Sequence, residues 1–127
     1  MSNNQIIKKI FPNGFPQRGE IYQIDFKKIG KGKEIAKKRP ALIISNDLQN
    51  QYDDYLIVAP LTSCNVAKIR LFELLVKVKG LTKPSKILLN QIRSIDKEIR
   101  VVEYLGKVSD QILKEVESKL KLVLAMV

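Results

Sequence analysis

The sequence of 127 residues contains no histidine, no tryptophan and a single cysteine, Cys64. Without an imidazole, the chain cannot form the Ser-His or Cys-His pairs on which many nucleophilic hydrolases depend. The lack of histidine nearly excludes a zinc site, and one cysteine cannot form an internal disulfide. We therefore expect no metal and no cofactor, and a protein of a reducing compartment, the cytoplasm.

Long apolar runs and nucleotide-binding motifs are missing as well. No stretch approaches the ~20 apolar residues of a membrane-spanning helix, and neither G-x-x-x-x-G-K-[ST] nor G-x-G-x-x-G occurs. The first residues, MSNNQIIKKIF, do not resemble a secretory signal. Asp53 and Asp54 stand side by side, but no further ligands cluster near them, and a solvated turn is the better interpretation. A soluble domain without a membrane partner is expected.

Positive charge is what the chain has in excess. It carries 23 Lys and Arg against 13 Asp and Glu, a net charge of +10. Residues 27–39 hold +6 and residues 65–87 hold +5, so these two segments account for the whole excess. Scattered lysines would serve solubility, whereas two concentrated basic segments favour a polyanionic partner, DNA or RNA.

The apolar pattern predicts a single domain of short strands. Residues 1–17 indicate an irregular arm, and residues 18–127 form the domain. Residues 20–26 alternate like a half-buried strand, while the continuous apolar runs 40–45 and 55–61 fit strands buried on both faces. A loop is expected over 27–38, a polar turn over 49–54, and further strands over 72–78, from 87 and over 99–105.

After Gly106 the period becomes helical. Ser109 is a good N-cap, and an apolar stripe follows at helical spacing. Its members are Ile112, Leu113, Val116, Leu120, Val123, Leu124 and Val127. The sequence therefore predicts a mainly β (α+β) fold, a small barrel or strongly coiled sheet with a C-terminal α-helix.

Two groups of residues suggest chemistry. Arg39 directly precedes one buried strand, and Thr62 and Ser63 end the next. If these strands are neighbours, a guanidinium and two hydroxyls converge, an arrangement suited to a phosphate. A surface arginine and a turn-capping hydroxyl remain an equally good interpretation.

Gln91 and Arg93 would share one face of a strand. An ion pair between Arg93 and Asp96 that ties down a turn is the alternative.

Five segments occur in order across residues 18–127: RGEIYQIDF, KKRPALIISND, VAPLTS, SKILLNQIRSIDK and LGKVSDQILKEVESKLKLVLAM. Together they resemble the MazF/PemK (Kid) family of toxin endoribonucleases. The resemblance implies an SH3-like barrel of the CcdB/PemK type, a homodimer and a cognate acidic antitoxin. It also implies metal-independent cleavage of single-stranded RNA, usually mRNA, at a short sequence, leaving 2′,3′-cyclic phosphate and 5′-hydroxyl ends.

The resemblance also implies site residues. The catalytic arginine and threonine fall on Arg39 and Thr62, and Arg18-Gly19 match a structural element. RNA-binding positions fall on Ser63, Ser85, Gln91 and Arg93, and the basic segments add Lys33, Lys37, Lys38, Lys68, Arg70 and Lys86. In one branch of the family an arginine and a carboxylate act in catalysis where this chain has Leu88 and Asn90. This departure favours a mechanism based on Arg39 and Thr62.

Two other functions remain open at this stage. The shared barrel allows a CcdB-like poison of DNA gyrase, because a fold does not fix a function. The charge distribution alone suits a non-catalytic nucleic-acid-binding barrel equally well. The R-P and T-S elements argue against the gyrase poison.

Overall fold

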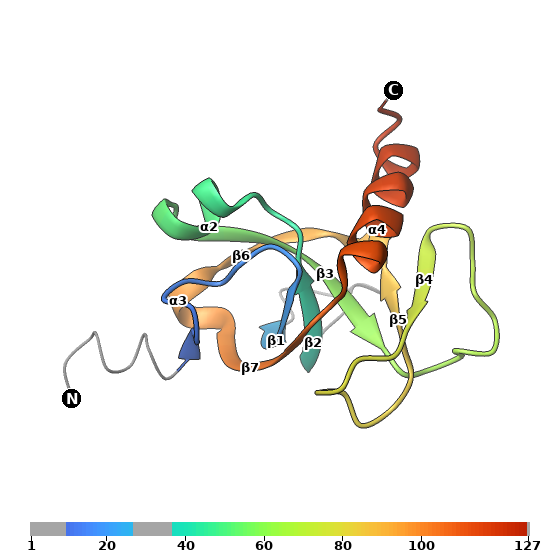
Figure 1. Cartoon of the computed structure of the whole chain (residues 1–127), viewed down its shortest axis with the longest axis horizontal. Helices are drawn as coiled ribbons and strands as arrows, with labels where there is room; N and C mark the ends of the chain where they lie inside the picture. Colours follow the sequence, from blue (N-terminus) through green and yellow to red (C-terminus); the bar gives the residue numbers. More distant parts are fainter. Residues whose placement is uncertain (1–9, 27–36, 127) are drawn as a thin grey trace.

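The computed structural model describes residues 10–26 and 37–126. Within them the elements are β1 (Glu20–Phe26), β2 (Lys37–Ile43), α2 (Asp47–Tyr52), β3 (Tyr55–Thr62), β4 (Glu73–Val76), β5 (Ser85–Leu88), the 3-10 turn η1 (Leu89–Gln91), β6 (Arg93–Asp96), α3 (Lys97–Arg100), β7 (Val101–Lys107) and α4 (Asp110–Val123). Figure 1 shows α4 standing beside β4 and β5, with α2 and α3 at the other end of the sheet. The predicted fold class, mainly β with a C-terminal helix, is confirmed.

The strands form one antiparallel arrangement in the order β4-β5-β3-β2-β1-β7, and β6 also pairs with β3. β3 is the central strand, because β2 lies on one of its edges while β5 and β6 follow one another along the other edge. Leu61 pairs with Ile87 and Val58 pairs with Arg93. Between these pairs, the segment that joins β5 to β6 has three more residues than β3. The turn η1 accommodates the three extra residues.

Side chains on both faces of the central strands are buried. Tyr22, Ile24 and Ala41 belong to one apolar cluster, whereas Ile21 and Leu42 belong to the other. Successive residues of a strand point to opposite faces, so alternate positions supply the two clusters. The prediction that the runs beginning at residues 40 and 55 are buried on both faces is confirmed.

Helix α4 covers the second cluster. The Ser109 hydroxyl oxygen accepts a hydrogen bond from the Ile112 N–H at 3.2 Å, so the predicted N-cap is confirmed. Val116 is fully buried, and Ile112, Leu113, Leu120 and Val123 pack on the same cluster. The stripe was expected to continue to residue 127, but the helix ends at Val123 and Leu124 is 52% exposed. Val127 lies outside the described residues.

Several expected boundaries are wrong. Residues 47–52 form a helix rather than a turn, because the Asn46 side chain caps it by accepting from the Gln49 N–H at 2.8 Å. Residues 97–100 form a short helix, capped by Asp96, where the last strand was expected to begin at residue 99. β2 begins at Lys37, inside the expected loop, and β4 covers only Glu73–Val76 of the expected 72–78.

The described residues that precede β1 are tied to the rest of the fold. Gly19 has φ +92°, a conformation that favours glycine, and its N–H donates to the Ile43 carbonyl at 2.9 Å. Arg18 donates from Nε to the Ile44 carbonyl and pairs with Glu117 of α4 at 2.9 Å. Phe11 is buried in the first cluster. Among the described residues, no helix is long and apolar enough to cross a membrane.

Candidate active site

The register of the sheet brings Arg39 and Thr62 together. Ala41 of β2 pairs with Pro60 of β3, and both side chains of interest lie two residues further along. They therefore occupy opposite positions on the same face of neighbouring strands. Arg39 Nη1 lies 3.4 Å from Thr62 Oγ1. The sequence left this contact conditional on the two strands being neighbours, and the structure fulfils that condition.

Both side chains retain hydrogen-bond donors for a ligand. Arg39 Nε is buried and has no hydrogen-bond partner within the described residues. Thr62 Oγ1 accepts hydrogen bonds from Arg39 and from the Cys64 N–H, the latter at 3.1 Å. A hydroxyl offers one donor and two acceptor positions, so the Thr62 O–H remains available as a donor. Because Arg39 Nε is covered by the protein, a ligand in the pockets would meet the Thr62 O–H and the rest of the Arg39 guanidinium.

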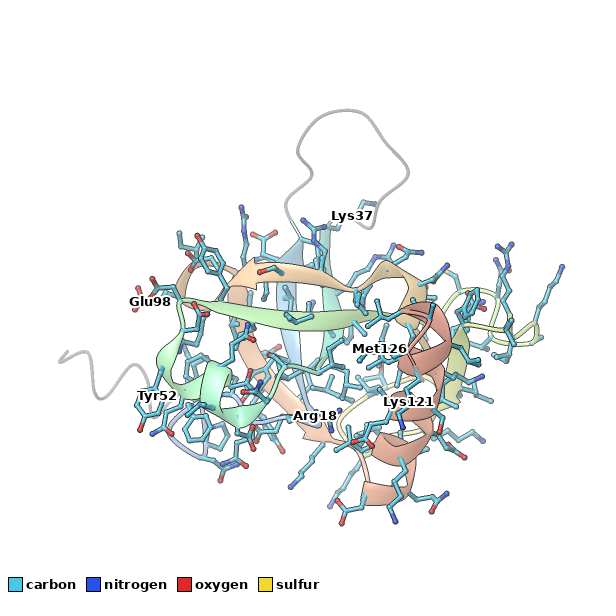
Figure 2. All side chains as sticks on the ribbon, turned by 90° about the horizontal axis from the view of Figure 1, so that it is seen from above. Arg18, Lys37, Tyr52, Glu98, Lys121 and Met126 are labelled. Carbon is cyan, nitrogen blue, oxygen red and sulfur yellow. The ribbon has the colours of Figure 1, made fainter. Side chains whose placement is uncertain are left out.

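One pocket beside Arg39 and Thr62 is lined by Ser85, and we call it the Ser85 pocket. It measures about 370 Å³ and shares Arg39 and Thr62 with the second pocket described below. Its other polar lining residues are Lys37, Lys38, Ser63, Thr82, Lys83 and Ser85. Figure 2 shows Lys37 at the edge of the molecule away from Arg18 and Tyr52. The pocket thus carries three lysines beside the arginine, a site for an anionic ligand.

A second pocket opens on the other side, and we call it the Lys68 pocket. It measures about 540 Å³ and includes Arg39 and Thr62 again. Lys68, Arg70, Lys86 and Gln91 line it, together with Glu73 and Leu88. Arg39 and Thr62 therefore stand at the junction of two basic pockets that lie next to one another.

The individual predicted residues differ in what they contact. Ser85 is buried, and its hydroxyl donates to the Lys83 carbonyl at 3.1 Å, within its own turn. The Lys86 ammonium group donates to Glu73 at 2.8 Å and to the Lys68 carbonyl at 3.1 Å. Lys33 lies outside the described residues. Lys86 is therefore engaged within the protein, unlike an exposed lysine.

The pairing of Gln91 and Arg93 on one strand is wrong. Gln91 ends η1 and lines the Lys68 pocket, whereas Arg93 begins β6. The Arg93 guanidinium lies 5.2 Å from the centre of the Phe26 ring, a cation–π arrangement, and Arg93 lines neither of the two pockets. The turn η1 rotates the chain between the two residues, which a two-residue spacing cannot reveal.

Sequence reasoning missed Glu73 and Thr82. Glu73 is the only acidic residue between positions 65 and 87, and this isolation within a basic segment was the signal that could have found it. Burial opposes ionisation of the Glu73 carboxyl, but hydrogen bonds from Lys86 and the Arg70 N–H hold its pKa below the ordinary value. Glu73 is therefore a buried carboxylate that stays ionised.

The chain is similar to known proteins in sequence and in fold. A family model described as PemK-like, MazF-like toxin of type II toxin-antitoxin system matches residues 17–124. The chain is 39% identical over 112 residues to a curated protein, Endoribonuclease MazF of Staphylococcus saprophyticus, covering 87% of this chain and 92% of the relative.

Solved structures show the same fold. MazF of Deinococcus radiodurans is 29% identical, with a TM-score of 0.76, over 88% of this chain and 98% of that one. The Mycobacterium tuberculosis toxin MazF-mt6 is 17% identical, with a TM-score of 0.70, over 85% of this chain and 98% of that one. The residues matched by the family model, 17–124, include β2 and β3, which carry Arg39 and Thr62.

Proposed function

This chain belongs to the family of PemK-like, MazF-like toxins of type II toxin-antitoxin systems and is an endoribonuclease, and from that premise we propose that it cleaves single-stranded RNA, such as mRNA, at a short sequence. In this proposal Arg39 and Thr62 act on the scissile phosphate. The products are a 2′,3′-cyclic phosphate and a 5′-hydroxyl, and the reaction uses no metal.

One observation carries the proposal. The Arg39–Thr62 contact lies at the junction of two basic pockets, and the Thr62 O–H is not used as a donor within the described residues. A phosphodiester bound at the junction would accept from this O–H and from the Arg39 guanidinium, which lines both pockets, and its flanking nucleotides would extend into one pocket each. The substrate would then cross the pair as an extended single strand.

The mechanism follows from the substrate's own nucleophile. The ribose 2′-oxygen attacks the phosphorus, the bond to the 5′-oxygen breaks, and one proton passes overall from the 2′-hydroxyl to the 5′-oxygen. Negative charge grows on the non-bridging oxygens in the transition state. The Arg39 guanidinium and the Thr62 hydroxyl would stabilise that charge, because donors fixed in advance by strands need no rearrangement.

RNA binding would divide between the two pockets. Lys37, Lys38 and Lys83 would contact backbone phosphates in the Ser85 pocket. Lys68 and Arg70 would do so in the Lys68 pocket, where the Gln91 amide offers a donor and an acceptor to a base edge. Ser63 and Ser85 would add polar contacts close to the phosphate.

Protein partners form the second part of the proposal. MazF of Deinococcus radiodurans, solved in a structure named MazE-MazF, is 26% identical to this chain. A cognate acidic antitoxin would neutralise the same basic pockets and exclude RNA from them.

A homodimer is also proposed, since Leu122, Leu124 and Met126 are exposed where α4 ends. Sedimentation at micromolar concentration should then give twice the mass of the 14.5 kDa chain.

The direct test is to incubate the protein with a mixed RNA in EDTA and to sequence the ends. We expect cleavage at one short sequence, with cyclic-phosphate and 5′-hydroxyl ends. A DNA of the same sequence should stay intact, because it lacks the 2′-hydroxyl. Intact RNA after long incubation would identify a binder without catalysis, and a requirement for metal would also overturn the mechanism.

The role of Arg39 is tested by Arg39→Ala. We expect cleavage to fall by about 10²–10³-fold, because the main stabiliser of the phosphorane charge is lost. Thermal unfolding should stay close to that of the wild type, since the variant removes one long hydrogen bond of 3.4 Å to Thr62 and an Nε–H that has no partner within the described residues. Arg100→Ala on α3 is the matched control and should cleave normally. Wild-type cleavage by Arg39→Ala would contradict the assignment.

A further inference from the structure

The wall of the Lys68 pocket is a connecting segment, residues 63–72, between β3 and β4. Most of its side chains are exposed, including those of Lys68 and Arg70. Few buried apolar contacts therefore hold this segment in place. Its shape must be set by hydrogen bonds, and those bonds determine where its two cations stand relative to Arg39 and Thr62.

A buried ion pair supplies two of these bonds. Glu73 and Lys86 come from neighbouring strands β4 and β5, and they are only 7% and 6% exposed. Their charged groups are 2.8 Å apart. The Glu73 carboxylate also accepts from the Arg70 N–H at 2.9 Å, and the Lys86 ammonium donates to the Lys68 carbonyl at 3.1 Å. The pair therefore holds the backbone of both residues that supply the pocket's cations.

The charges of Glu73 and Lys86 match the backbone groups that each of them contacts. An N–H needs an acceptor and a carbonyl needs a donor, so the carboxylate and the ammonium each match the group they contact. Lys119 of α4 adds a third contact by donating to the Leu71 carbonyl at 3.0 Å. Because Glu73 neutralises Lys86, this lysine contributes little free charge to a passing phosphate. Its contacts mark it as part of the wall rather than of the RNA track.

We propose that Glu73 and Lys86 are positioning residues, which hold residues 63–72 so that Lys68 and Arg70 line the RNA path beside Arg39 and Thr62. The inference rests on the proposed function for its RNA substrate, but the ordering of the segment does not depend on RNA. Neither residue touches the scissile phosphate. Their loss should therefore weaken substrate binding more than the chemical step.

The first test uses Glu73→Met in an Arg39→Ala background, so that a long single-stranded RNA of mixed sequence can bind without being cut. Methionine removes the acceptor of the Arg70 N–H and adds one positive charge to the pocket. Simple electrostatics predicts tighter binding, whereas the positioning role predicts binding about three- to ten-fold weaker. Glu115→Met on the exposed side of α4 is the control for the same change of charge and should bind like the background protein. Unchanged or tighter binding by Glu73→Met would overturn the proposal.

The second test uses the double variant Glu73→Met/Lys86→Met. It keeps the net charge and replaces a buried ion pair by apolar side chains of similar size, which folded proteins often tolerate. The double variant can therefore test the proposal even if the single variant does not fold. We expect amide hydrogen exchange at Arg70 to accelerate at least ten-fold, while the buried strands β1 to β3 keep their protection. In cleavage assays KM should rise several-fold and kcat should stay within about two-fold.

The outcomes separate this proposal from the proposed function. A raised KM with unchanged exchange at Arg70 would assign Lys86 a direct RNA contact and overturn the positioning role. A wild-type KM would overturn it whatever the exchange result. If the wild-type protein does not cleave RNA at all, the proposed function fails, while the exchange measurement still decides whether the pair orders residues 63–72.

Discussion

Thr62 has a hydroxyl whose acceptor positions are both occupied by the protein, by the Arg39 guanidinium and by the Cys64 N–H. The remaining O–H can only donate, which suits a phosphate oxygen and fixes the direction of the contact. The role of this residue therefore depends on one proton rather than on shape.

Thr62→Val tests that dependence, because valine has nearly the same shape without the hydroxyl. We expect cleavage to fall by about 10–100-fold with little change in the RNA affinity, since one donor to the transition state is lost. Thr62→Ser keeps the donor and should retain most of the activity. Single-turnover cleavage of a short RNA measures both variants. An active Thr62→Val together with an impaired Thr62→Ser would show that the methyl group matters instead.

Tyr22 gives a prediction about pH. Its buried hydroxyl donates to the Glu20 carboxylate at 2.9 Å. Burial, followed by the charge and hydrogen bond of Glu20, raises the pKa of Tyr22 far above its ordinary value near 10. A raised pKa in the folded state means that stability is fully present below pH 10 and is lost as the pH rises further.

Tyr22→Phe should remove this alkaline loss at the expense of about 1 kcal/mol at pH 7, the contribution of one hydrogen bond. Denaturant unfolding between pH 7 and pH 11 measures both effects. The wild type should lose up to about 1.4 kcal/mol per pH unit above pH 10 through this one group, and the variant should lose less. Parallel pH curves for the two proteins would contradict the prediction.

Single residues differ in how well the sequence predicts their role. The contact between Arg39 and Thr62 could be anticipated because each borders an apolar run that the pattern already marks as a strand. Lys86 and Arg93 could not be distinguished from surface cations, because their partners Glu73 and Phe26 are distant in sequence. The local pattern predicts where a side chain stands, and tertiary packing decides what it contacts.

At the scale of elements, the turn between β4 and β5 is held against β7 by a close backbone approach. A methyl group at Gly80 would lie 1.5 Å from the Leu105 carbonyl oxygen, and that atom belongs to a paired strand that cannot easily move. The same turn carries Thr82 and Lys83 into the Ser85 pocket. The contact thus links a strand at the edge of the sheet to the substrate path.

Gly80→Ala should push the turn away from β7, with a loss of about 1–3 kcal/mol of stability and a several-fold loss of RNA affinity. Gly14→Ala is the matched control. Gly14 has φ +89° and open space around it, so alanine there brings conformational strain without a collision and should leave RNA affinity unchanged. Thermal unfolding and RNA binding measure the two effects. Equal RNA affinity in both variants would refute the link to the pocket.

The elements themselves were predictable to different degrees. The long strands and α4 follow from strong periodicity, and the Ser109 cap marks where the helix begins. The helices α2 and α3 escaped prediction because they are too short to show a period, and their caps, Asn46 and Asp96, look like ordinary turn residues. Their existence depends on side-chain hydrogen bonds rather than on an apolar stripe.

At the scale of the whole molecule, the net charge of +10 predicts that RNA affinity depends on the salt concentration. If four to six cations of the two pockets contact phosphates, the logarithm of the binding constant should fall with a slope of about −3 to −4 against the logarithm of the salt concentration. Affinity would then drop about 100-fold between 50 and 200 mM salt.

Removing two cations should change that slope. Lys68→Met/Arg70→Met should make it shallower by about 1.4, because each phosphate contact on a single strand contributes about 0.7. Lys114→Met/Lys121→Met on α4 removes the same charge elsewhere and should leave the slope as it is. Filter binding at four salt concentrations decides the matter, and an affinity indifferent to salt would exclude an electrostatic RNA path.

The position of Arg39 and Thr62 on paired strands has a consequence for how such a protein can diversify. The strand ladder fixes the two side chains proposed to act on the phosphate, whereas segments 63–72 and 77–84 form much of the surrounding walls. Under the proposed function, exchanging those segments between relatives should transplant the preference for an RNA sequence and leave the cutting chemistry in place. A new target would therefore require new loops and no new catalyst.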